Sequence, residues 1–297
     1  MTHKAMRKNP IVLQQGMTIG SNNAESDDNF LFECFVHYSA VEQFKDLASA
    51  SMVLSGRTGS GKTAILRYIK HNSENAVELD PLEMAMGYIA NSDALRFVES
   101  IGGNLDILFQ TLWKHVLCIE FIRLRYSVDT ENRSKNVFDT LVRVFKGDAR
   151  RERAIEYLRK WEGKFWITVD QNIRELTESV EAQLNAEFGG EIKKFAAGGQ
   201  YRKRVSNEKK QEFRNRTQKI INEHQLADLG GVIDILKNEE NKNSMSKYYI
   251  MIDDLDTKWV DDSVRFKLIR SLIESLKPLR RIPTLKILVA LREDILE

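Results

Sequence analysis

The most informative stretch of the sequence is Gly56-Arg57-Thr58-Gly59-Ser60-Gly61-Lys62-Thr63. It matches the pattern G-x-x-x-x-G-K-[ST] at every specified position. Glycines in such a stretch let the backbone curl until successive N–H groups converge on phosphate oxygens, and a helix that follows adds the positive end of its dipole. The stretch therefore predicts a P-loop that binds the phosphates of a nucleoside triphosphate, and ATP is the expected ligand.

Two side chains of this loop have specific expected roles. The ammonium of Lys62 is expected to reach the β- and γ-phosphates, and the hydroxyl of Thr63 is expected to ligate Mg²⁺. The loop follows a short apolar run, 51–55, and precedes a stretch with apolar residues at helical spacing, 64–71. These flanks predict a strand before the loop and a helix after it, which is the setting that a P-loop requires.

A second informative stretch runs from an apolar segment, Tyr248 to Ile252, into the acidic cluster Asp253-Asp254-Leu255-Asp256. Magnesium bound to a triphosphate needs a carboxylate at the end of a neighbouring strand. We expect Asp253 to supply that carboxylate. Asp254 is the first choice for the group that orients or deprotonates the attacking water, and Asp256 is the alternative.

The third stretch is the apolar run Leu285 to Leu291, which ends in Arg292. Ligands of parallel sheets lie off the carboxyl ends of the strands. Arg292 would therefore lie at the edge of the γ-phosphate if this strand neighbours the strand before the P-loop. A guanidinium there would sense the γ-phosphate and offset charge that develops during phosphoryl transfer. The alternative is a surface arginine that closes a strand.

Together these three stretches resemble the KAP and STAND branches of the P-loop ATPases, which are mostly large bacterial proteins of signalling and anti-phage defence. The resemblance implies an α/β core of the ASCE type, with a parallel sheet in the order 5-1-4-3-2. It also implies ATP hydrolysis with Mg²⁺, a water-activating acid after the Walker B aspartate and a sensor at the end of the fourth strand. These roles fall on Asp254 or Asp256 and on Arg292.

The resemblance covers 30–81 and 248–297 and leaves the middle of the chain unmatched. KAP proteins often carry membrane segments between the two Walker motifs, whereas the pattern of this insertion is that of a soluble, helical segment. The chain also stops directly after the expected fourth strand, so the fifth strand and a helical lid are absent. We expect the chain to be part of a longer protein whose C-terminal part is missing.

The remaining patterns divide the chain into a polar N-terminal arm, a P-loop core in two pieces and a large helical insertion between Walker A and Walker B. The expected boundaries are 1–28 for the arm, 29–90 and 247–297 for the core, and 91–246 for the insertion. Apolar periodicity predicts helices at 30–47, 105–126, 137–146, 149–161, 167–188 and 263–276, and a second strand at 76–79.

A basic segment lies within the insertion, from Lys193 to Lys219, with ten basic against two acidic side chains, a net of +8. The simplest interpretation is a set of solvated helix faces, because Lys and Arg usually stay exposed. The alternative is a contact with nucleic acid or an acidic partner. Tyr201 and Phe213 are interleaved with the basic residues, as stacking platforms for bases would be.

Composition narrows the remaining function classes. The chain has 45 basic and 43 acidic residues in 297, so its overall charge favours neither nucleic acid nor membrane. No apolar stretch approaches the roughly 20 residues of a membrane span. Cys34 and Cys118 lie in apolar surroundings without C-x-x-C spacing, which is typical of reduced core cysteines in the cytoplasm.

Three functions fit these observations. The first is an ATP-hydrolysing switch in a larger signalling or defence protein. The second is a motor or loader that acts on nucleic acid through the basic segment, and the third is an interaction module that binds ATP without turnover. A small-molecule kinase is disfavoured because the Asp253-Asp254 pair suits water activation. The sequence leaves a homo-oligomer open.

Overall fold

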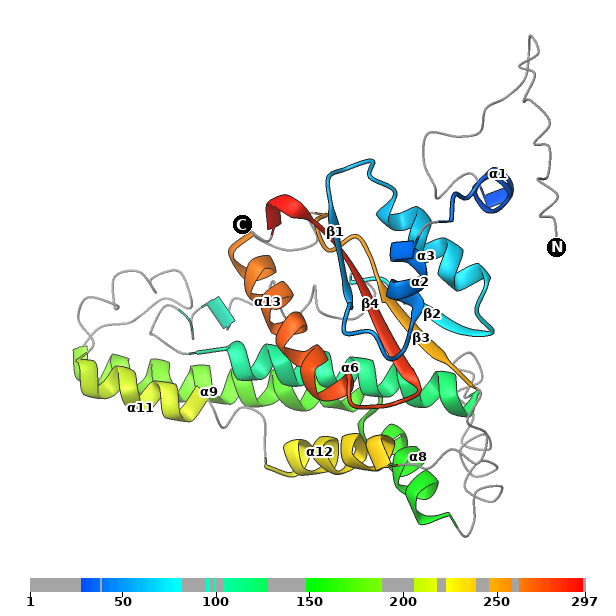
Figure 1. Ribbon diagram of the computed structural model, residues 1–297. Helices are drawn as coiled ribbons and strands as arrows, with labels where there is room; N and C mark the ends of the chain where they lie inside the picture. The colour runs from blue at the N-terminus through cyan, green and yellow to red at the C-terminus, as the bar shows by residue number, and fades with distance from the viewer. Residues whose placement is uncertain are drawn as a thin grey trace, which may run out of the picture.

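The computed structural model describes residues 28–37, 39–81, 95–96, 99, 104–127, 148–188, 206–217, 223–238, 246–257 and 262–295 (Figure 1). The predicted helix at 137–146 and nearly all of the N-terminal arm lie outside these residues. The strands of the described residues are β1 (Val53–Gly56), β2 (Asn75–Leu79), β3 (Tyr248–Ile252) and β4 (Leu285–Arg292). Their helices are α1 (Asp28–Glu33), α2 (Ser39–Lys45), α3 (Lys62–His71), α6 (Asp106–Tyr126), α8 (Ala149–Trp161), α9 (Lys164–Phe188), α11 (Asn207–Thr217), α12 (Glu223–Asn238) and α13 (Asp262–Leu279), with the short 3₁₀ turn η2 (Glu293–Ile295).

The four strands form one sheet in the order β1-β4-β3-β2, and every pair in it is parallel. Parallel neighbours cannot be joined by tight hairpins, so each connection crosses over through helix. This confirms the predicted α/β class with a parallel sheet. The four predicted strands are also confirmed, with ends that differ from the sequence prediction by at most two residues.

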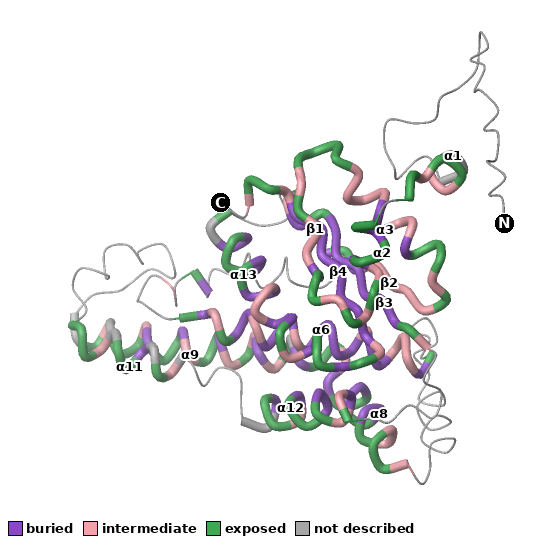
Figure 2. Tube along the Cα trace, in the orientation of Figure 1, coloured by how far each residue is buried: buried purple, intermediate pink, exposed green. Residues whose placement is uncertain are grey.

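Helices cover both faces of the sheet. Ile250 and Ile252 of β3 belong to the large core cluster that includes α6 and α13, while Tyr249 and Met251 belong to the smaller cluster with α2 and α3. All five residues of β3 are buried, which explains why the strand is a continuous apolar run instead of an alternating one. The burial of the central strands is visible as purple in Figure 2.

The helical segment between β2 and β3 shares its core with the sheet. The helix α6 packs against β2, β3 and α13, and Trp113 at its centre donates a hydrogen bond from Nε1 to the carbonyl of Leu268 at 2.9 Å. Thirteen of the 21 residues of α6 are buried, so this helix is apolar on most of its circumference. Helices α8 and α12 pack in turn against α6, while α9 and α11 lie side by side farther out (Figure 1).

A buried lysine fixes the start of β4. Lys286 is 2% exposed, and its ammonium donates to the carbonyls of Asp46 and Ser49 at 2.7 Å each. Burial lowers the pKa of this ammonium. The contact ties the loop that follows α2 to the amino end of β4. The carboxyl end of β4, where Arg292 lies, is at the opposite end of the strand from this contact.

The single helix predicted at 30–47 is wrong, because the structure has two helices, α1 and α2, with a break around 34–37. Aromatic and β-branched residues in this break are weak helix formers. The break also lets Phe35 stack on Tyr68 with ring centroids 4.0 Å apart.

Cys34 is exposed, so the expectation that it is a core cysteine is wrong. Cys118 is buried, and burial raises the pKa of its thiol to about 12.

None of the described helices is long and apolar enough to cross a membrane.

Candidate functional site

The motif 56–63 forms the connection between β1 and α3. Strand β1 ends at Gly56 and helix α3 begins at Lys62, so the loop occupies the carboxyl edge of the parallel sheet. Gly59 and Gly61 have φ angles of +78° and +85°, in the left-handed region that side chains disfavour. The loop therefore needs glycine at these two positions to keep its curled path.

The start of α3 is open to an anion. Gly61 occupies the N-cap and has no side chain with which to satisfy the first N–H groups of the helix. Those groups and the helix dipole favour negative charge at this end. A triphosphate in the loop would supply the acceptors that a capping side chain supplies elsewhere.

The left-handed backbone conformation at Gly61 leads to a prediction about stability. We expect Gly61→Ala to lower the free energy of unfolding by about 1 to 2 kcal/mol, since a side chain in the left-handed region costs roughly that amount. The matched control is Gly230→Ala, within α12, where an added Cβ meets no atom within 4 Å. It should stabilise the protein by up to about 1 kcal/mol through helix propensity. Urea unfolding of both variants checks this, and a Gly61→Ala protein as stable as the wild type would contradict it.

The Lys62 ammonium lies over the P-loop. Its Nζ donates to the carbonyls of Gly56 and Arg57 at 3.1 and 3.0 Å. The side chain thus folds back across the loop 56–63. The role of Lys62 at the β- and γ-phosphates stays a prediction.

Asp253 follows β3 directly and is 8% exposed. Its Oδ1 accepts a hydrogen bond from the backbone N–H of Asp254 at 2.9 Å. Its Oδ2 is buried and has no hydrogen-bond partner among the described residues. A buried carboxylate oxygen left unpaired is costly, and a cation would satisfy it. This oxygen fits the metal-side role predicted for Asp253.

The described residues include no group of three or more His, Cys, Asp or Glu side chains that would hold a metal ion by themselves. Mg²⁺ is commonly bound by one or two carboxylates together with substrate phosphates and water. Strand β4 separates β1, which precedes the loop 56–63, from β3, which precedes Asp253, so these two strands lie about two strand spacings, roughly 10 Å, apart. Thr63 and Asp253 would hold such an ion together with phosphate oxygens and water.

The loop after β3 arranges the other two acidic residues differently. Asp254 is exposed and has a φ of +57°, and its carbonyl accepts hydrogen bonds from the N–H and the hydroxyl of Thr257. Asp256 is partly buried, and its Oδ2 lies 3.5 Å from Nε of Arg292. The carbonyls of Asp256 and Thr257 both accept from Arg265, a buried residue of α13. Arg265 therefore fixes the shape of this loop.

Arg292 lies beside the P-loop. In the pairing of β1 with β4, Arg292 is opposite Gly56, the first residue of the motif. The condition set by the sequence, that the strand ending in Arg292 neighbours the strand before the P-loop, is therefore met. The guanidinium contacts the carboxylate of Asp294 through Nε at 3.0 Å and Nη2 at 2.7 Å.

Sequence analysis missed three residues at this edge. Arg265 is an arginine within the apolar face of α13, and its buried position depends on the loop it supports. Asp294 and Glu293 follow Arg292 in sequence, and Glu293 lies 3.8 Å from the exposed Arg57 of the P-loop. Acidic residues after a strand are common in turns, so the sequence carries no signal that separates these two from ordinary turn residues.

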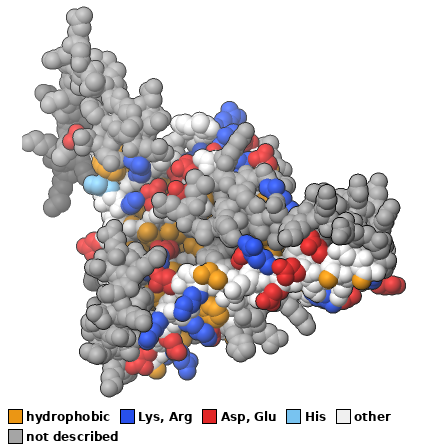
Figure 3. Space-filling model, turned by 180° about the vertical axis from the view of Figure 1, so that it is seen from behind, with side chains coloured by type: hydrophobic (Ala, Val, Ile, Leu, Met, Phe, Trp, Pro, Cys, Tyr) orange, Lys and Arg blue, Asp and Glu red, His pale blue; other side chains and the backbone are white. Residues whose placement is uncertain are grey.

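The basic segment is described only over 206–217. The prediction that Phe213 offers a stacking surface is wrong, because Phe213 is 2% exposed and lies on α11, which packs against α9. Arg216 pairs with Glu212 on the same helix at 2.8 Å. Tyr201 and the cluster Arg202-Lys203-Arg204 lie outside the described residues. Seen from behind, the described surface intermixes basic and acidic side chains (Figure 3).

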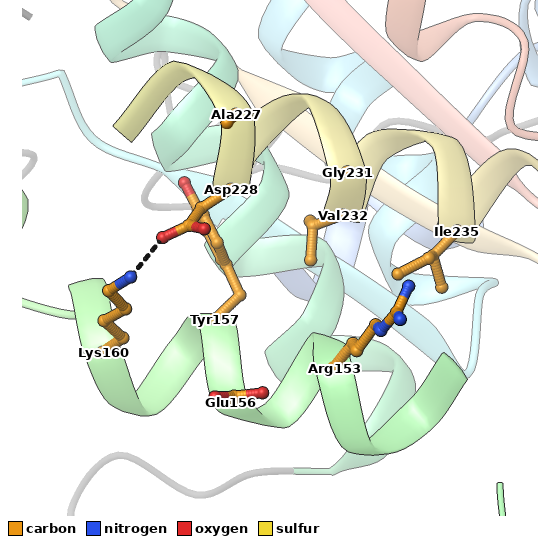
Figure 4. Close-up of a pocket in the computed structure, with 9 residues that line it drawn as sticks. All are labelled: Arg153, Glu156, Tyr157, Lys160, Ala227, Asp228, Gly231, Val232 and Ile235. Carbon is orange, nitrogen blue, oxygen red and sulfur yellow. Dashed lines mark hydrogen bonds and ion pairs between the residues drawn. The ribbon is translucent and has the colours of Figure 1, made fainter. Parts of the chain in front are cut away.

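A cavity of about 280 Å³ lies between α8 and α12 (Figure 4). Its lining includes Val232 and Gly231, and Lys160 and Asp228, which also line it, form an ion pair at 2.6 Å. No residue from the carboxyl edge of the sheet lines it. The cavity is therefore separate from the candidate site.

Comparison of the chain with known proteins finds no matching family model, no matching curated protein and no matching solved structure.

Proposed function

We propose that the chain binds ATP with Mg²⁺ at the P-loop and hydrolyses it. The observation that carries this proposal is the convergence of three sequence stretches at one edge of the sheet. The P-loop follows β1, Asp253 follows β3, and Arg292 ends the strand between them. Phosphate-binding backbone, a metal-binding carboxylate and a positive sensor group are the parts that phosphoryl transfer to water requires.

The topology supports an ASCE-type core. The order β1-β4-β3-β2 agrees with the 1-4-3-2 portion of the order that the resemblance to KAP and STAND ATPases implies. In that arrangement the Walker A and Walker B strands are separated by the strand that carries the sensor. The place of this activity in a larger signalling or defence protein rests on the resemblance alone.

Each side chain then has a distinct task. The P-loop N–H groups and Lys62 hold the phosphates, while Thr63 and Asp253 would hold Mg²⁺, which neutralises charge on the phosphate oxygens. Asp254 orients the attacking water or takes its proton. We assign this role to Asp254 before Asp256, because the carboxylate of Asp256 lies 3.5 Å from Nε of Arg292.

Steady-state phosphate release tests the proposal. We expect release that saturates with ATP and requires Mg²⁺. Saturable ATP binding without release would favour the non-hydrolysing interaction module. Stimulation of release by single-stranded or duplex DNA or by RNA, weakening with salt, would favour the motor or loader that uses the basic segment Lys193 to Lys219.

A further inference from the structure

Two carboxylates from different segments hold the guanidinium of Arg292. Asp294 lies in the η2 turn and takes Nε and Nη2 together, in the two-pronged geometry that makes arginine–carboxylate pairs specific. Asp256 approaches Nε from the loop after β3, at 3.5 Å. The Arg292 side chain is 39% exposed, so the contacts lie at the rim of the site and within reach of solvent.

We propose that Asp294 and Asp256 are positioning residues that hold Arg292 in the nucleotide-free chain and compete with the terminal phosphate for it. The inference rests on the proposed function and adds a determinant of nucleotide selectivity. Arg292 is opposite Gly56 in the sheet, so its side chain starts beside the loop that would hold the phosphates. The same Nε–Nη2 edge that binds Asp294 suits a phosphate equally well.

This competition affects the binding of ATP and of ADP differently. A γ-phosphate brings additional negative charge and acceptor oxygens to the carboxyl edge of the sheet, and these replace Asp294 on the guanidinium. ADP lacks that group, so Arg292 stays with the two carboxylates. The two acids therefore weaken ATP binding, because the exchange costs an existing ion pair, and leave ADP binding nearly unchanged.

The test compares the affinities of Mg²⁺-bound ADP and of a Mg²⁺-bound non-hydrolysable ATP analogue in four proteins: wild type, Asp294→Asn, Arg292→Gln and the double variant. We expect Asp294→Asn to tighten analogue binding by about 2- to 5-fold, the range for partly exposed ion pairs, with less than about a 2-fold effect on ADP. In the Arg292→Gln background the same substitution should have no effect on the analogue, since the group it releases is gone.

Two further variants separate this positioning role from general charge removal. Asp294→Glu keeps the charge and should bind the analogue like the wild type. Glu293→Gln removes the same charge one residue earlier, where the nearest partner is Arg57 instead of Arg292, and should change the affinities for both nucleotides by the same factor.

The outcomes also distinguish this inference from the proposed function. Equal effects of Asp294→Asn on both nucleotides, or an undiminished effect in the Arg292→Gln background, would overturn the inference while leaving ATP binding intact. Failure of the wild-type chain to bind either nucleotide would overturn the proposed function and the inference with it.

Discussion

We expect Lys62→Ala to lower ATP turnover by about 10²- to 10³-fold, the usual loss when one pre-placed stabiliser of developing charge is removed. The ammonium of Lys62 lies over the loop, bonded to the carbonyls of Gly56 and Arg57. In the proposed site this ammonium is the positive charge that the loop would place against the β- and γ-phosphates. Phosphate release measured at several ATP concentrations checks this expectation and separates lost binding from lost turnover.

The matched control is Lys70→Ala on the same helix. Lys70 pairs with Glu78 at 2.8 Å near the other end of α3, so its removal deletes an equal charge without touching the loop. It should leave turnover within about 2-fold of the wild type, because exposed ion pairs contribute little. Turnover by Lys62→Ala at the level of Lys70→Ala would exclude the P-loop from the reaction.

We expect Asp254→Asn to stop hydrolysis and leave Mg²⁺–ATP binding intact, and Asp253→Asn to weaken the dependence of binding on Mg²⁺. The expected loss of turnover for Asp254→Asn is about 10²- to 10⁴-fold, the range for a positioned acid or base. The two effects differ because the buried, unpaired Oδ2 of Asp253 suits a metal, while Asp254 is exposed next to it. Titration of Mg²⁺ at fixed ATP, followed by phosphate release, resolves the two roles.

Asp256→Asn tests the alternative assignment in the same assays. If Asp256 only positions Arg292, its variant keeps hydrolysing ATP. If Asp256→Asn binds ATP without hydrolysing it and Asp254→Asn still turns over, the water-activating role belongs to Asp256. Asp234→Asn on α12 serves as the remote control, since its carboxylate pairs with Lys237, three residues later on the same helix, at 3.0 Å.

The sheet and the candidate site residues could be predicted from the sequence. In the strands that carry these residues, the clear local sequence pattern coincides with burial. The strands β3 and β4 are buried along nearly their whole length, so their apolar runs carry the signal directly. The P-loop glycines are required by backbone angles, at Gly59 and Gly61, that the motif itself encodes. Because the strands are parallel, Asp253 and Arg292 could both be predicted to lie at the carboxyl edge of the sheet.

The remaining features depend on tertiary contacts that no local pattern carries. Phe213 is a lone aromatic residue in a strongly charged helix, and only the packing of α11 on α9 buries it. Asp256 contacts Arg292 from 36 residues earlier in the chain, whereas Asp294 is only two residues away from Arg292. The contact of Asp256 with Arg292 requires β4 to lie beside β3 and the loop after β3 to take the shape that Arg265 imposes.

Calorimetric titration of ATP into the wild-type chain, with and without Mg²⁺, tests the proposed nucleotide site directly. We expect one saturable ATP site per chain, tighter with Mg²⁺ and lost in the Lys62→Ala variant. The absence of saturable binding at millimolar ATP with Mg²⁺ present, or binding that Lys62→Ala leaves unchanged, would contradict it.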